Sequence, residues 1–343
     1  MKKIIALLLI LSPVSFLYAC TTFFIHKNGQ MVFGRNYDWV TDAGMVCTNL
    51  KGLSKTSMKT ENGETISWIS KYGSITFNQY GKEFPTGGMN EKGLVVELMW
   101  LDETKYPAAD NRPAIGVLQW IQYQLETIEE IIATDKQLRI SPTGTTPLHY
   151  LVADANGKEA TIEFLYGKMV VHKGADLSFP VLTNNTYDES VKSVKSSSSN
   201  GNNSLERFGE ACKMIQQLNT NNTPKPLTDY AFDILEKVAQ GDFTKWGIVY
   251  DITNKTIQFK TDQFKQIKKI AFSAFDFNCS ATAKVWDMNQ KASGSVNSLF
   301  QNFNIAINKR IVETAAKESE SRVSITRKNI EALWQYASGI KCQ

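Results

Sequence analysis

Apolar residues form short runs, or alternate with polar residues, in seven segments of the chain. This spacing is typical of β-strands that are buried on one or both faces. It predicts strands at 21–25, 31–36, 94–100, 148–154, 159–165, 246–251 and 256–261. The dipeptide Asn28-Gly29 lies between the first two segments and is typical of a tight hairpin turn. The first two strands are therefore expected to pair as a hairpin.

Apolar residues spaced three and four apart predict helices at 114–133, 205–218 and 229–239. The first helix follows Pro113 and carries one apolar stripe, which consists of Leu118, Ile121, Leu125, Ile128 and Ile132. Gly241 closes the third helix. Strand hairpins interleaved with amphipathic helices indicate a protein of mixed α and β structure.

Residues 20–343 are predicted to form a single domain, because no linker divides them. Hydrophobic residues make up 42% of the chain and charged residues 21%, which allows a large core. The Ser- and Asn-rich stretch 196–203 is expected to be a flexible polar loop within the domain. In the extension 291–343, Val312, Ala316 and Leu333-Trp334-Tyr336 predict two helices that cover the body or contact another subunit.

The first 19 residues have the organisation of a secretory signal peptide. Lys2 and Lys3 precede an apolar run at 4–11, and Ala19 supplies a small residue for cleavage. The apolar run is too short to span a bilayer. Cleavage after Ala19 would make Cys20 the first residue of a secreted or periplasmic protein. A terminal Cys carries a thiol and a free α-amine on one residue, and the two can act together as nucleophile and base.

Leu17-Tyr18-Ala19-Cys20 also resembles the lipobox of a bacterial lipoprotein. In that case the thiol would be lipidated, and the protein would be a membrane-anchored binding module without catalytic activity. A strand that begins directly after Cys20 favours the catalytic interpretation, since lipoproteins usually have a polar tether there. Both interpretations remain open from the sequence.

The predicted hairpin brings Arg35 and Asp38 back toward Cys20. A free thiol has a pKa of about 8.5 and an α-amine a pKa of about 7.7 to 8.0. A nearby Arg favours the thiolate, and a carboxylate can hold the amine in place. An ordinary surface ion pair between Arg35 and Asp38 is the alternative if Cys20 is not terminal.

Cys20-Thr21-Thr22, followed by the run 34–39 (Gly-Arg-Asn-Tyr-Asp-Trp), resembles the opening of the choloylglycine hydrolases. These are N-terminal nucleophile amidases that include bile salt hydrolases and penicillin V acylases. Further segments resemble the family in the same order up to about residue 290, at 88–94, 149–157, 161–163, 181–185, 204–208 and 246–259. The resemblance implies an α+β fold, a four-layer αββα sandwich.

The resemblance also implies a site and a mechanism. The Cys20 thiolate would attack an amide carbon while the α-amine takes the thiol proton and then protonates the leaving nitrogen; water would cleave the thioester. The Asn184 side chain and the backbone N–H of Trp100 would bind the oxyanion. Asp38 would orient the amine, and Arg35 and Arg207 would shape the field at the thiolate. Better-known relatives have Asn or Tyr at the position of Trp100, which puts a side-chain contribution there in doubt.

The implied substrate is a small N-acyl amide with a linear C–N bond that is not a peptide bond. The short segment between Asn184 and Arg207 resembles the Gram-negative branch and favours a penicillin V acylase type. A bile salt hydrolase, an N-acyl homoserine lactone acylase, and acyl transfer in place of hydrolysis remain open, as does a homo-oligomer. An apolar acyl pocket or core packing would account equally for Phe23, Phe24, Tyr37, Trp39, Trp68 and Trp100.

Net charge, histidines and cysteines bear on possible partners, metal sites and disulfides. Removal of Lys2 and Lys3 lowers the formal net charge from +4 to +2, too small to suggest a nucleic-acid partner. The chain has three histidines, and none has metal-ligand spacing, so neither a metal nor a cofactor is expected. The sequence does not decide between free thiols and up to two disulfides among Cys47, Cys212, Cys279 and Cys342.

Overall fold

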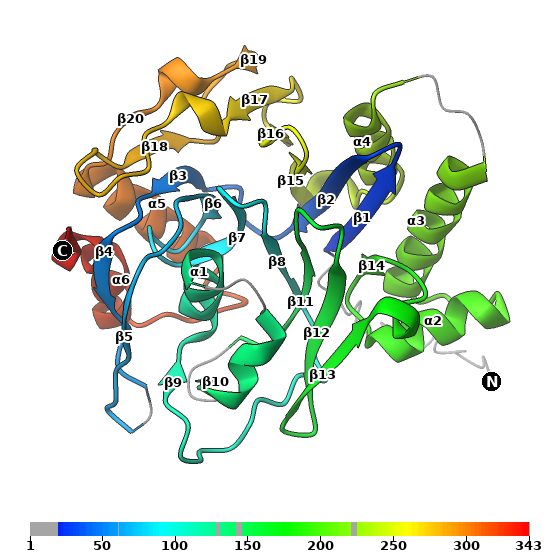
Figure 1. The fold of residues 1–343 in the computed structure, drawn as a ribbon, viewed down its shortest axis with the longest axis horizontal. Helices are drawn as coiled ribbons and strands as arrows, with labels where there is room; N and C mark the ends of the chain where they lie inside the picture. Colours follow the sequence, from blue (N-terminus) through cyan, green and yellow to red (C-terminus); the bar gives the residue numbers. More distant parts are fainter. Residues whose placement is uncertain (1–19, 61, 128–130, 142–145, 221–224, 343) are drawn as a thin grey trace, which may run out of the picture.

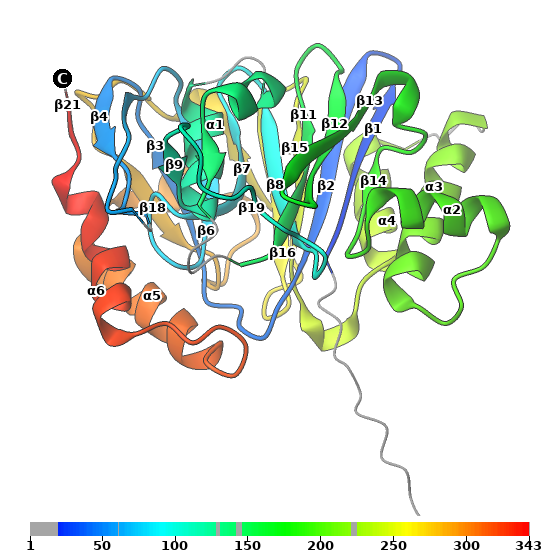
Figure 2. The ribbon, with the colours of Figure 1, turned by 90° about the horizontal axis from the view of Figure 1, so that it is seen from below.

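The computed structural model describes residues 20–60, 62–127, 131–141, 146–220 and 225–342 (Figure 1). The predicted signal peptide, 1–19, lies outside the described residues. Two large sheets face each other, and helices cover the outer face of each (Figure 2). This four-layer αββα arrangement confirms the fold that the resemblance implied.

The first sheet contains the predicted N-terminal hairpin as its second and third strands. Its strand order is β14 (Val181–Leu182), β1 (Thr21–Lys27), β2 (Gln30–Asp38), β15 (Thr244–Asp251), β16 (Thr256–Thr261), β17 (Lys268–Ala271) and β19 (Gly294–Ser295). Asn28 and Gly29 both have positive φ angles, as a two-residue hairpin turn requires. The pairing then runs without interruption from Lys27 opposite Gln30 to Thr21 opposite Asn36.

The second sheet has the order β13 (Lys168–Lys173), β12 (Glu159–Leu165), β11 (Leu148–Ala153), β8 (Val95–Trp100), β7 (Pro85–Asn90), β6 (Ser74–Asn78), β3 (Met45–Asn49), β18 (Lys284–Asp287) and β20 (Gln301–Asn302). Two small sheets flank it: β9 (Ala114–Ile115) with β10 (Arg139–Ile140), and β21 (Lys341–Cys342) with β4 (Leu53–Thr56) and β5 (Ser67–Ile69).

The helices divide between the two outer faces (Figure 2). Helices α2 (Tyr187–Ser196), α3 (Asn203–Thr220) and α4 (Leu227–Lys237) lie on the side of the first sheet, where α3 contacts β1 and α4 contacts β2 and β15. Helix α1 (Val117–Thr127) packs on β7 and β8 of the second sheet. The C-terminal helices α5 (Ile305–Glu318) and α6 (Arg327–Gln335) pack against each other on that same side.

Strand β8 shows how residue alternation builds the two buried layers. Val95 and Met99 belong to the main core between the sheets, whereas Val96 and Leu98 pack in the layer with α1. Successive side chains of a strand point to opposite faces, so one strand serves both layers. Glu97 shares the inner face with Val95 and Met99 and is therefore placed between the sheets.

The predicted strands and the second and third helices are confirmed with shifts of one or two residues at most of their ends. The first helix was predicted too long. Ala114–Ile115 forms strand β9 instead, α1 begins at Val117, and residues 128–130 lie outside the described part. The pairing of β9 with Arg139–Ile140 gives this segment hydrogen bonds that local periodicity does not reveal.

Several elements were not predicted. Helix α2 ends at Ser196, so only 197–202 connects it to α3, a shorter stretch than the loop expected at 196–203. The Thr186 side chain caps α2 by accepting from the Glu189 backbone N–H. Strands β3 and β6 are fully buried yet carry polar side chains that bond to one another, as in the bonds from Asn49 to Ser74 and Thr76, and this obscured their pattern.

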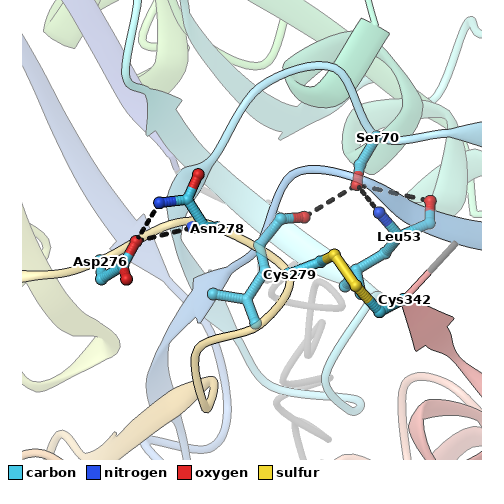
Figure 3. Close-up of a disulfide and its surroundings, with 7 residues drawn as sticks. Leu53, Ser70, Asp276, Asn278, Cys279 and Cys342 are labelled. Carbon is cyan, nitrogen blue, oxygen red and sulfur yellow. Dashed lines mark hydrogen bonds between the residues drawn. A yellow bond between two sulfur atoms is a disulfide. The ribbon is translucent and has the colours of Figure 1, made fainter.

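A disulfide joins Cys279 to Cys342 near the C-terminus (Figure 3). Beside it, the Ser70 hydroxyl accepts from the Leu53 backbone N–H at 2.9 Å on strand β4. Cys342 itself pairs with Leu53 in the small sheet. The disulfide therefore fastens the end of the two-helix extension, and both helices expected there are present. No helix among the described residues is long and apolar enough to cross a membrane.

Candidate active site

Cys20 directly precedes β1, the first strand of the N-terminal hairpin, and lines a cavity of about 500 Å³. Because Thr21 pairs with Asn36, the main chain of Cys20 lies beside Tyr37 and Asp38. The Cys20 Sγ is 3.9 Å from the Asp38 backbone oxygen. The side chain is 4% exposed, and the cavity has a volume suited to a small-molecule ligand. The hairpin thus places the sulfur where a bound molecule can reach it.

Arg35 lies between the two sheets, where it is fully buried. Its guanidinium donates to the Glu97 carboxylate on β8 and to the backbone oxygens of Thr86 and Leu98, each at 3.0 Å. The Tyr250 hydroxyl donates to the other oxygen of Glu97. Arg35 is therefore not part of a surface ion pair with Asp38, the alternative considered from the sequence, but bridges the sheets.

The room for the Glu97 carboxylate comes from Gly87 on the neighbouring strand. A Cβ added at Gly87 would lie 2.0 Å from a carboxylate oxygen of Glu97. Gly87 and Gly88 lie within β7 and not in a turn, so their role is close packing. Burial raises the pKa of Glu97 to about 7, against the opposing charge of Arg35.

The electrostatic field at Cys20 has opposing contributions. Burial raises the pKa of the thiol above its usual value, and the Asp38 charge acts in the same direction. Arg35 opposes the rise most strongly, and Arg207 also lowers the pKa. In a chain that retains residues 1–19 the thiol is therefore mainly neutral, and a base is needed to form the nucleophilic thiolate.

Asp38 is fully buried at the end of β2, beside Cys20. Neither of its carboxylate oxygens is within hydrogen-bond geometry of a donor in the described residues. Burial raises the pKa of this carboxyl to about 7, while Arg207, the neighbouring Thr244 hydroxyl and Arg35 oppose the rise. A buried carboxylate without a donor is unfavourable, so this position suits a cationic or N–H partner.

Arg207 of helix α3 connects the start of β1 with Asn184. Its guanidinium donates to the Cys20 backbone oxygen and the Thr21 hydroxyl, both at 2.6 Å, and to the Asn184 Oδ1 at 3.1 Å. Asn203, one turn earlier in α3, accepts from the Arg207 Nε at 2.9 Å. The side chain is buried, so Arg207 is not part of a solvated helix face.

The Asn184 amide is oriented by its two partners. Its oxygen accepts from Arg207, and its Nδ2 donates to the Trp100 backbone oxygen at 2.8 Å. One Nδ2–H accounts for that bond, and the amide group carries a second. The structure therefore brings the Asn184 side chain together with the backbone of Trp100, which lines the cavity.

A buried histidine supports this segment from behind. The His149 Nε2 lies 2.7 Å from the Thr183 backbone oxygen, and its Nδ1 lies 3.2 Å from Glu163. Glu163 also accepts from the Tyr187 backbone N–H at the start of α2. His149 thus holds the residue next to Asn184, and its contacts indicate a structural role.

Comparison with known proteins identifies the family of this chain. The profile described as "Linear amide C-N hydrolases, choloylglycine hydrolase family" matches residues 20–225, more than half of the chain. The chain belongs to the choloylglycine hydrolase family.

Individual relatives agree with this family. The chain is similar to penicillin V acylase of Pectobacterium atrosepticum, with 30% identity over 199 residues, which cover 50% of this chain and 51% of the relative. The match thus spans about half the length of that curated relative. The structure is similar to that of penicillin V acylase from Agrobacterium tumefaciens, with a TM-score of 0.72 and 25% identity, covering 83% of this chain and 98% of the other.

A variant of conjugated bile acid hydrolase from Clostridium perfringens has the same fold. Its TM-score is 0.68 at 17% identity, covering 80% of this chain and 98% of the other. Members of the choloylglycine hydrolase family are hydrolases of linear amides, and Cys20 is the first residue of the matched range.

Only some of the expected aromatic residues line the cavity. Tyr37, Trp39 and Trp100 do, whereas Phe23 and Phe24 pack in the main core. Trp68 packs against Tyr123 in the layer beside α1. Their strands determine this division, because each exposes only one face toward the cavity.

The sequence interpretation missed Glu97, Gly87 and the Tyr250 hydroxyl. A single acidic residue within the apolar strand predicted at 94–100 was the only signal for Glu97. Cys47 and Cys212 are free and buried, and neither lines the cavity. Within the described ranges, no group of three or more His, Cys, Asp or Glu residues is placed to hold a metal ion.

The ion pair between the sheets predicts a specific energetic coupling. Arg35→Met should lower the free energy of unfolding by about 3–5 kcal/mol, because it leaves the Glu97 carboxyl buried without its cation. Adding Glu97→Gln should recover part of this loss, since the amide carries no charge and fits the same space. Urea unfolding of the two single variants and the double variant measures the coupling. Strictly additive losses would contradict a direct ion pair.

Proposed function

We propose that the mature chain is a secreted cysteine amidase of the N-terminal nucleophile type, which hydrolyses the linear, non-peptide C–N bond of an N-acyl amide. Its nucleophile is Cys20, and the reaction passes through a thioester. The observation that supports this most directly is the buried Asp38 carboxyl beside Cys20: no group among the described residues donates to it within hydrogen-bond geometry, and the Thr244 hydroxyl lies near enough only to lower its pKa in part. Cleavage after Ala19 would place a free α-amine on Cys20 and supply a donor.

The α-amine completes the reacting group. In the unprocessed chain the Cys20 nitrogen is an amide and cannot act as a base. After cleavage the amine takes the thiol proton, directly or through water, and Asp38 holds the resulting ammonium. Arg35 and Arg207 stabilise the thiolate, since both already lower the pKa of the Cys20 thiol.

The same groups carry the later steps. The thiolate attacks the amide carbon, and the resulting oxyanion is bound by the second Nδ2–H of Asn184 and by the Trp100 backbone N–H. Arg207 supports this assignment, because its bond to the Asn184 oxygen turns the amide nitrogen toward Trp100. A preorganised donor of this kind contributes about 2.7–4 kcal/mol to transition-state stabilisation. The ammonium then protonates the leaving nitrogen, and water cleaves the thioester.

The cavity favours an apolar acyl group. Tyr37, Trp39, Leu98 and Trp100 line it near Cys20, together with residues of α1 and the C-terminal extension. We propose a penicillin V acylase-like specificity, in agreement with the names of two proteins to which the chain is similar. Bile salts and N-acyl homoserine lactones are the alternative substrates, and both would use the same mechanism.

The proposed location is outside the cytoplasm, in the periplasm or the medium of a bacterium. The signal-peptide pattern of residues 1–19 supports it. The disulfide between Cys279 and Cys342 supports it independently, because such bonds persist mainly in oxidising compartments. A homo-oligomer remains a prediction from the family resemblance.

The nucleophile is tested by substitution. Cys20→Ala should lower the rate of hydrolysis of N-phenoxyacetyl amides by at least about 10³-fold, because no other group can form the thioester. Cys212→Ala removes another buried free thiol, one that does not line the cavity, and should retain activity. Product release is followed by chromatography, and thermal unfolding shows that both variants are folded. Full activity of Cys20→Ala would end the proposal.

Processing is tested by mass. The secreted protein should begin with an unmodified Cys20 and contain 324 residues, as measured by intact and peptide mass spectrometry. A diacylglyceryl group on Cys20 would instead remove the thiol from chemistry. That result would replace the amidase with a lipid-anchored binding protein.

If Asp38 pairs with the α-amine, the effect of Asp38→Asn on the free energy of unfolding should change sign when cleavage exposes the amine. In a chain with a cleavable tag before Cys20, the raised pKa of Asp38 destabilises the fold progressively as pH rises from about 4 to 7. Asp38→Asn should therefore stabilise the tagged chain at pH 8, by about 4 kcal/mol at most, and the gain should vanish below pH 4. After tag removal exposes the amine, Asp38→Asn should destabilise the protein instead, because it leaves the ammonium unpaired.

Urea unfolding before and after cleavage, with and without Asp38→Asn, measures the effect of the substitution on the free energy of unfolding in both forms. All four proteins retain Thr21. The hydrogen bond from Arg207 to the Thr21 hydroxyl therefore contributes equally to each free energy of unfolding. The same sign of effect in tagged and cleaved proteins would show that the amine does not contact Asp38.

A further inference from the structure

One wall of the cavity comes from the C-terminal extension. Residues 323–333, here called the strap, comprise the segment before α6 and most of that helix. The strap contributes Val323, Ser324, Ile325, Asn329 and Leu333 to the cavity that also contains Cys20 and Asp38. These side chains are apolar or neutral, so the strap presents no charge to a bound molecule.

The strap lies outside the part of the chain that identifies the family. The family match ends at residue 225, about a hundred residues before the strap begins. The reacting end of the cavity is built within the matched range, by Cys20 and by residues of β2 and β8. The strap wall therefore lies outside the residues that the family match covers.

The strap is held at both ends. Before it, α5 packs its Ile311 against Met45, Cys47 and Val285 on the outer face of the second sheet. After it, the Tyr336 hydroxyl donates to the Thr56 backbone oxygen at 2.6 Å, and the disulfide of Cys342 fastens the chain end.

The strap also has fixed contacts at Ile325 and Leu333 and directly after its last residue. Asn308 of α5 donates to the Trp334 backbone oxygen at 2.8 Å, which connects the two C-terminal helices. Ile325 and Leu333 pack with Leu118 of α1 and with Tyr80, in a small cluster beside the cavity. A wall held in this way has a defined shape and can discriminate between ligands.

A chain of hydrogen bonds connects this wall to the nucleophile hairpin. The Trp39 indole, one residue after Asp38, donates to the Tyr80 hydroxyl at 3.0 Å, and Tyr80 donates to the Ser319 hydroxyl at 3.0 Å. Ser319 donates in turn to the Ala315 backbone oxygen in α5, at 2.7 Å. Val323, the first residue of the strap, donates its backbone N–H to the Ser319 backbone oxygen at 2.8 Å, so this series of contacts reaches the strap.

We propose that the strap sets the length of the acyl group that the enzyme accepts, with Ile325 and Leu333 as the determining side chains. This inference rests on the proposed amidase function and names the substrate class more closely: N-acyl amides whose apolar acyl group is limited in length by the strap. The thiolate attacks the acyl carbon at one end of the cavity. The far end of the acyl chain then meets an apolar wall, whereas a polar amine leaving group would gain little there.

The test compares acyl chains of rising length on one common amine. Leu333→Ala opens the wall, and the ratio of kcat/KM for the longer over the shorter acyl chain should rise by about tenfold. Ile325→Ala should act in the same direction, and Ser324→Trp, which adds bulk, should shift the preference to shorter chains. The change should appear mainly in KM. Leu299→Ala is the matched control, because Leu299 is exposed and does not line the cavity.

A second measurement does not depend on amide hydrolysis. The rate of Cys20 alkylation is measured by peptide mass spectrometry with iodoacetamide and with a maleimide that carries a long alkyl chain. Leu333→Ala should speed the reaction with the bulky reagent relative to iodoacetamide, and Leu299→Ala should not. The buried thiols Cys47 and Cys212 serve as internal references for unfolding.

The two readouts separate the two proposals. If no amide is hydrolysed but the alkylation ratio changes, the strap wall stands and the amidase function fails. If amides are hydrolysed but neither ratio changes in Leu333→Ala and Ile325→Ala, the strap proposal is overturned and the amidase function stands. Equal losses for all acyl lengths would also overturn it, since they indicate a structural effect alone.

Discussion

The ion pair between Arg35 and Glu97 is the interaction on which the arrangement of the site depends. It joins the two sheets in the interior, where a single unpaired charge would be strongly unfavourable. Arg35 reaches Glu97 only if the hairpin of β1 and β2 lies in one position over β8. The same strands carry Cys20, Asp38 and Trp100, so the pairing of these charges also fixes the distance between the nucleophile and the cavity wall. Gly87 is part of this constraint, because any side chain there would occupy the place of the carboxylate.

The remaining site residues are brought together by a second buried cation. Arg207 comes from a helix on the outer face of the first sheet, yet its donors reach Cys20, Thr21 and Asn184. It therefore holds the first residues of β1 against the segment that follows β14. His149 supports the same segment through the backbone of Thr183. Each of these contacts satisfies a polar group that burial would otherwise penalise, and together they leave Asp38 as the carboxylate beside Cys20 without a donor among the described residues.

The cavity is built from two separate parts of the chain. Its reacting end is formed by strands within the range that matches the choloylglycine hydrolase family, and one of its walls is formed by the strap. The disulfide and the packing of α5 hold the strap in place through residues that are not themselves part of the reacting group. This division separates the chemistry of amide cleavage from the selection of the acyl group, because one end of the cavity can change while the geometry at Cys20 is kept.

The sequence by itself determined the elements whose signals are local. Asn28-Gly29 and the alternation on either side gave the N-terminal hairpin, and the ordered resemblance led to Asn184, Arg207 and Trp100. The position of Cys20 after a cleavage signal gave the candidate nucleophile. Only the tertiary structure decided the partners: Glu97 for Arg35, Cys279 for Cys342, and the strap for the cavity. The physical reason is that periodicity and turn chemistry act between near neighbours in the chain. Which buried charges, thiols and walls meet depends on how distant strands pack, and residues 35 and 97, or 20 and 333, have no local pattern in common.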